Sequence, residues 1–122
     1  MCEVRVNDIV WDVNLTVKGD PKLQEDDMSV LGITKYDTAE VLIRMDISPE
    51  LMYRTIKHEL THVYIFSYGI DSTNLSEENV ADFMESFSEK IVEDAKYIYS
   101  ELKKDKLLDL TISKCIKVSN SV

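Results

Sequence analysis

Residues 48–69 read SPELMYRTIKHELTHVYIFSYG, and this stretch decides the fold. Ser48 is a favourable helix N-cap, and Pro49 suits the first helical position, where its missing N–H has no partner to lose. Gly69 is a favourable stop after the last turn. The pattern predicts a helix from Pro49 to about Tyr68. Its apolar stripe at helical spacing consists of Met52, Ile56, Leu60 and Val63.

The second half of this helix carries the motif His58-Glu59-Leu60-Thr61-His62, which contains the only two histidines of the chain. Residues four apart on a helix share a face, so both imidazoles can reach one metal ion. Glu59 lies beside them, where a general base for a metal-bound water is needed. The motif predicts zinc-dependent hydrolysis, with a peptide bond as the expected target. The alternative is two ordinary histidines on a polar helix face.

A catalytic zinc site needs a third protein ligand, because such sites take three and keep the fourth position for water. No histidine remains, so a carboxylate is expected. The best candidate is Glu78, sixteen positions after His62, and Asp82 follows it on the same helix face. Asp82 could accept a hydrogen bond from a ligand histidine. Glu77 is the rival ligand, and either glutamate could simply complement the helix dipole.

A second helix is predicted from Ser76 to about Lys103. Its apolar stripe is expected to pack into the core while Glu78 faces the metal on another side of the helix. After it, Leu107 to Val118 is predicted to form a short helix followed by a strand. The stripe of the second helix consists of Val80, Met84, Phe87, Ile91, Ala95, Ile98 and Leu102.

Strands are expected upstream of the motif helix. Alternating apolar residues predict one strand from Val4 to Lys18. A polar loop is expected from Gln24 to Asp27. Val30 to Lys35 and Glu40 to Met45 then predict a hairpin or two adjacent strands. Residues 1–122 are therefore expected to form a single α+β domain, with helices packed on a small, mainly antiparallel sheet.

The composition of the chain excludes some classes of binding partner. The chain has 122 residues and a net charge of -9, which argues against nucleic acid, because phosphate binding needs clustered Lys and Arg. No apolar run approaches the length of a membrane span, so no membrane partner is expected. The N-terminus lacks the pattern of a signal peptide, so a reducing cytoplasm is expected, with Cys2 and Cys115 as free thiols. A disulfide between them is the alternative.

The HELTH motif with a downstream Glu-xxx-Asp resembles the gluzincin group of zincin metallopeptidases. In its small size the chain also resembles minimal zincin-like proteins of bacteria and their phages, some of which cleave repressor proteins. The likeness covers Val30 to Phe87. It implies that one upstream strand is an edge along which an extended peptide docks. It also implies residue roles: Zn²⁺ ligands His58, His62 and Glu78, general base Glu59, and a supporting carboxylate Asp82.

Two departures from this pattern are visible. The connection from His62 to Glu78 is short, and no dedicated donor for the transition state is identified; Tyr36, Tyr64 and Tyr68 qualify by residue type only. Without a separate substrate domain, a peptidase of this size is expected to cut one specific protein. The alternative is a catalytically inactive zincin-fold protein that binds another protein.

Overall fold

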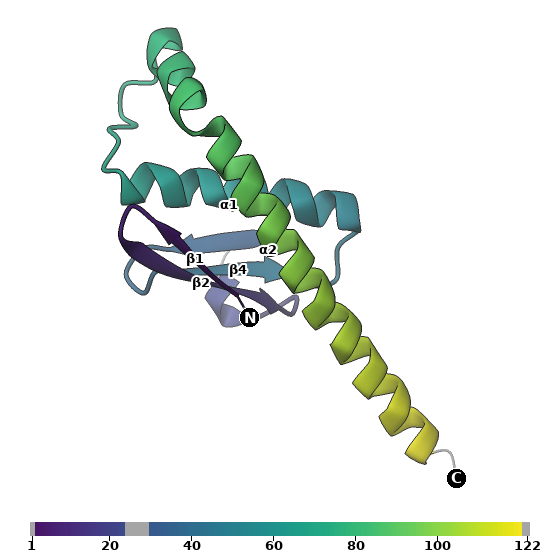
Figure 1. The fold of residues 1–122 in the computed structure, drawn as a ribbon. Coiled ribbons are helices and arrows are strands. Elements are labelled where there is room, and N and C mark those ends of the chain that lie inside the picture. Colours follow the sequence, from purple (N-terminus) through teal and green to yellow (C-terminus); the bar gives the residue numbers. More distant parts are fainter. Residues whose placement is uncertain (1, 24–29, 121–122) are drawn as a thin grey trace.

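A computed structural model describes residues 2–23 and 30–120 of the chain, with side chains up to Leu107. The fold is α+β, as predicted, with four strands and two long helices (Figure 1). The elements are β1 (Cys2–Val6), β2 (Ile9–Thr16), a 3-10 turn (Pro21–Leu23), β3 (Gly32–Lys35), β4 (Glu40–Arg44), α1 (Pro49–Ser67) and α2 (Glu77–Asn120).

The four strands form one mixed sheet in the order β1-β2-β4-β3. The two outer pairs, β1 with β2 and β3 with β4, are antiparallel. The central pair is parallel, with Val13 opposite Val41, so the sheet is mixed rather than purely antiparallel. In the described part of the chain, β3 is an edge strand with one side unpaired.

The predicted first strand was wrong in its extent, because two strands occupy that stretch. Asn7 and Asp8 both have positive φ, 46° and 72°, and they form the tight turn between β1 and β2. A two-residue turn with both φ values positive matches the twist of antiparallel strands. The predicted hairpin of β3 and β4 is confirmed. The predicted loop from Gln24 to Asp27 lies outside the described residues.

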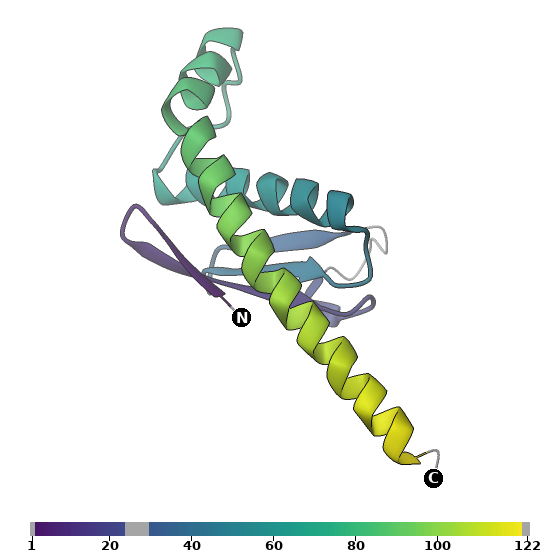
Figure 2. The ribbon, with the colours of Figure 1, turned by 45° about the vertical axis from the view of Figure 1, so that its right-hand side comes forward.

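Helix α1 begins and ends close to its prediction. The Ser48 side chain accepts a hydrogen bond from the Leu51 backbone N–H at 3.3 Å, and so caps the first turn. All four residues of the predicted stripe are buried against the sheet, while the histidines lie on another face. Helix α1 packs over β3 and β4, and α2 crosses it to pack over β1 and β2 (Figures 1 and 2).

Helix α2 begins where it was predicted to begin, but its C-terminal extent and the burial of its first turns differ from the prediction. It continues as one helix to Asn120, so the predicted helix-then-strand after Leu107 was wrong. No Gly or Pro follows Lys103, and extending an existing helix is easier than nucleating a new element. The predicted stripe is buried only from Ile91 onward: Val80 and Met84 are 48% and 52% exposed. They belong to the first turns of α2, which extend past α1 (Figure 1).

Candidate metal centre

The two histidines lie one turn apart on the outer side of α1. Their ring centroids are 5.1 Å apart, with an angle of 69° between the ring planes. His58 is exposed and His62 is half-buried. Neither imidazole hydrogen-bonds to another described residue, so a ring nitrogen of each is available to a metal ion.

Glu59 points from α1 toward the sheet rather than into solvent, and only 6% of the residue is exposed. Its carboxylate Oε1 accepts a hydrogen bond from Thr34 Oγ1 on β3, at 2.9 Å. The same hydroxyl lies 3.3 Å from the Glu59 carbonyl oxygen. Thr34 therefore fixes the carboxylate at the sheet edge. The sequence did not single out Thr34, because threonine is common in strands for packing reasons alone.

A cleft of about 410 Å³ runs between α1 and β3, and His58 and Glu59 both line it. Leu31 and Gly32 form the strand side of this cleft. Only glycine fits at position 32 without a shift, because β3 lies so close to α1 that a Cβ there would be 2.9 Å from Thr55 Cγ2. The glycine thus lets the edge strand lie close against the motif helix.

A larger cavity of about 620 Å³ lies on the other side of His58, between α1 and the first turns of α2. Thr61 and Ile65 line it from α1, while Val80 and Met84 line it from α2. Its lining is mostly apolar. This cavity separates the histidine face of α1 from the helix that carries Glu78.

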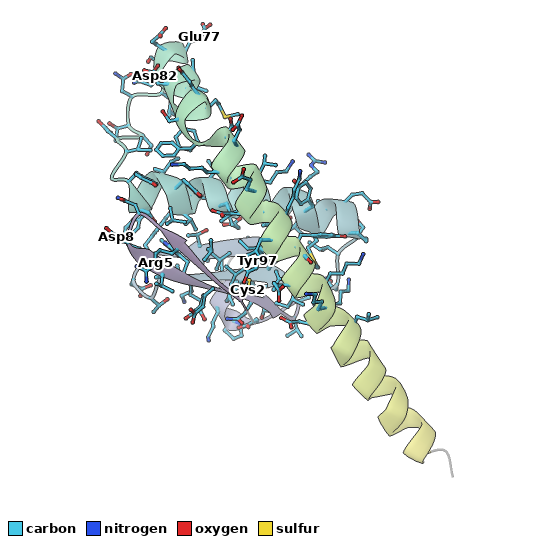
Figure 3. All side chains as sticks on the ribbon, viewed as in Figure 1. Cys2, Arg5, Asp8, Glu77, Asp82 and Tyr97 are labelled. Carbon is cyan, nitrogen blue, oxygen red and sulfur yellow. The ribbon has the colours of Figure 1, made fainter. Side chains whose placement is uncertain are left out.

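The predicted third ligand lies at the start of α2. Ser76 caps this helix by accepting a hydrogen bond from the Asn79 N–H at 3.1 Å. Glu77, Glu78 and Asp82 are all exposed, and Figure 3 shows Glu77 and Asp82 at the free end of the helix. Among side chains that the structure describes, no three of the His, Cys, Asp and Glu type converge into a metal-binding group. Helix α1 thus supplies two donors, and Glu78 does not join them here.

The tyrosines named as donors have other contacts. The Tyr64 hydroxyl donates to Asp94 Oδ2 at 2.5 Å, and burial together with Asp94 raises the pKa of Tyr64. Tyr68 packs on Phe87, with ring centroids 4.6 Å apart. Tyr36 directly follows β3 in the chain. Tyr64 therefore joins α1 to α2 as a structural residue.

Cys2 is a free, buried thiol on β1. Because Cys2 is free, the alternative Cys2–Cys115 disulfide is not formed in this structure; the side chain of Cys115 lies outside the described residues.

No family model, curated protein or solved structure matches this chain. Across the described residues, neither helix is long and apolar enough to cross a membrane.

Proposed function

We propose that the protein is a zinc-dependent metallopeptidase of the gluzincin type that cuts a specific protein substrate. One observation carries this proposal. His58 and His62 present free ring nitrogens on one side of α1, while Glu59 between them is anchored by Thr34 in a cleft beside an edge strand. Two histidines and a carboxylate so arranged form the core of a hydrolytic zinc site.

The histidine pair suits zinc, because imidazole nitrogen is a preferred ligand of this ion. A zinc ion held there supplies a bound water of lowered pKa and polarises a substrate carbonyl. Glu78 is the third ligand in this proposal. Because a cavity separates it from His58, the first turns of α2 must approach α1 for Glu78 to bind. That approach covers the apolar side chains of Val80 and Met84.

Glu59 moves the proton in this proposal. Its carboxylate takes a proton from the attacking water and later gives it to the leaving amine. The hydrogen bond from Thr34 keeps one carboxylate oxygen at the sheet edge, so the other oxygen is available toward the cleft. An extended peptide binds along the unpaired side of β3 by main-chain hydrogen bonds, which places its backbone beside Glu59.

The test is Glu59→Gln, with Glu50→Gln in the exposed first turn of the same helix as the matched control. Zinc content is measured by elemental analysis, and cleavage by mass spectrometry of new N-termini in a proteome-derived peptide library. We expect one zinc per chain in all three proteins and cleavage lost only in Glu59→Gln. Cleavage that survives Glu59→Gln, or a wild-type chain without zinc, contradicts the proposal.

A second candidate function is protein binding without catalysis. It is favoured by one observation: Glu78 lies apart from the two histidines among the described residues. A chain that captures a partner and leaves it uncut, with no zinc bound, supports this second function.

A further inference from the structure

The edge strand and the motif helix run side by side in the same direction. Three contacts between α1 and β3 with its following turn occur in chain order, so this row of contacts has two distinct ends. The contacts are Gly32 with Thr55, Thr34 with Glu59, and Tyr36 with Phe66.

The end of the cleft near Gly32 is cationic. Arg54 lines the cleft there, one helical turn before His58, and is exposed. Within the described chain its guanidinium has no ion-pair partner. The neighbouring Lys57 lies over the Tyr53 ring at 4.6 Å and lines the cavity on the other side of His58.

The other end of this row of contacts, beyond the cleft, is aromatic. Tyr36, just after β3, stacks on Phe66, with ring centroids 4.9 Å apart. The two residues are 45% and 46% exposed, so an apolar surface remains open to a partner. Phe66 also meets the edge of the buried Trp11, which holds it in place.

Arg54 and Phe66 lie on the same face of α1 as the two histidines. The four residues follow one another at intervals of four, the spacing of neighbours on a helix surface. We call this row the α1 ridge. It consists of Arg54, His58, His62 and Phe66. Arg54 and Phe66 are about 18 Å apart along a helix that rises 1.5 Å per residue, a span covered by about five or six residues of extended peptide.

The direction of a bound peptide follows from strand pairing. Antiparallel pairing is the more stable arrangement per residue, so we expect the peptide to run opposite to β3. Its N-terminal part then lies at Tyr36 and Phe66, and its C-terminal part at Arg54.

We propose that the α1 ridge selects a substrate segment with an aromatic residue on the N-terminal side of the cut bond and an acidic residue on the C-terminal side. The inference rests on the proposed function for the position of that bond. Because the chain as a whole repels acidic peptides, Arg54 decides whether an acidic residue is accepted in the cleft.

The test uses the full-length Glu59→Gln protein and two fluorescent eight-residue peptides of identical composition. One carries Phe near the N-terminus and Glu five residues later, and the other carries them in reverse order. Binding is measured by anisotropy. We expect the first peptide to bind about tenfold more tightly, as for one charge-assisted contact. Arg54→Glu and Phe66→Ala should each remove this preference.

The matched controls lie away from the cleft, on exposed positions that Figure 3 labels. Arg5→Glu on β1 and Tyr97→Ala on α2 should leave the preference unchanged. Equal binding of both peptides, no binding of either, or a preference that survives Arg54→Glu overturns the inference. Zinc content and library cleavage report on the peptidase separately, so an active zinc enzyme without the preference refutes only this inference.

Discussion

Helix α1 and the first turns of α2 each carry candidate metal ligands, but the two regions hold them differently. The face of α1 opposite the histidines is fully buried, so His58 and His62 are fixed relative to the sheet. The first turns of α2 leave both polar Glu78 and apolar Met84 exposed. In the proposed zinc site, two ligands are therefore preorganised and the third has to be brought to them. Metal binding should therefore also order and pack the start of α2.

Truncating one apolar residue in the middle of α2 and one in its first turns should give the largest contrast. Ile98 is fully buried, whereas Met84 is half-exposed on the same helix. Ile98→Ala should lower the free energy of unfolding by about 3 kcal/mol, because it removes core contacts and leaves a cavity. Met84→Ala should change it by less than about 0.5 kcal/mol in metal-free protein. Urea unfolding measures both; equal losses would show that the first turns of α2 are packed in solution.

Thiol reactivity should next separate the packed core, represented by Cys2 on β1, from the exposed first turns of α2. Burial raises the pKa of the Cys2 thiol to about 11, so at pH 8 it forms about 100-fold less thiolate than an ordinary cysteine of pKa about 9. A Cys115→Ser chain should react slowly with iodoacetamide, with the rate rising toward pH 11. Adding Val80→Cys should introduce a fast-reacting site. Equal rates for the two chains would contradict the contrast in burial.

Zinc affinity should distinguish the two neighbouring glutamates at the start of α2. Glu78→Gln should weaken zinc binding at least about tenfold, because even residues that only support a ligand typically matter that much. Glu77→Gln, exposed on the same turn, is the matched control and should bind zinc like wild type. Titration with a zinc-sensitive dye measures both affinities.

Hydrogen exchange tests the recruitment of this segment directly. Zinc should slow exchange across residues 70–84 in wild type and in Glu77→Gln, but not in Glu78→Gln. Protection confined to α1 would contradict the recruitment of α2.

The smallest expected effect concerns the hydrogen bond that anchors Glu59. Thr34→Val removes the hydroxyl at 2.9 Å and should cost about 1 kcal/mol of stability. A double-mutant cycle with Glu59→Met, which removes the acceptor oxygen, should give a coupling energy of about 1 kcal/mol. The matched control is Thr61→Val, whose hydroxyl donates within the helix to the Lys57 carbonyl oxygen. Zero coupling would mean that Thr34 does not hold the carboxylate.

Local chemistry explains what the sequence predicted well. The Ser48 cap, the Met52 to Val63 stripe and the helical spacing of the histidines are all set by neighbours along the chain. The turn at Asn7 and Asp8 was missed, although the apolar positions change from even to odd numbers there and Asn and Asp both favour turns.

Tertiary geometry explains what the sequence could not supply. Helical periodicity shows which side chains share a face of α2, but not where along its length that face meets the rest of the fold. For this reason the Val80 and Met84 turns were predicted to be buried. The hydrogen bond between Thr34 and Glu59 joins residues that are 25 positions apart in the sequence. It forms only because β3 packs against α1.

The most direct test of the central claim is a crystal structure grown with zinc, with anomalous diffraction recorded at the zinc edge. The proposed zinc site should give one strong peak per chain, about 2.0–2.2 Å from His58, His62 and the Glu78 carboxylate, with a fourth position open. The first turns of α2 should then lie closer to α1, with the cavity between them reduced. No peak at the histidines, or a zinc ion bound there without Glu78, would show that these three residues do not form the proposed zinc site.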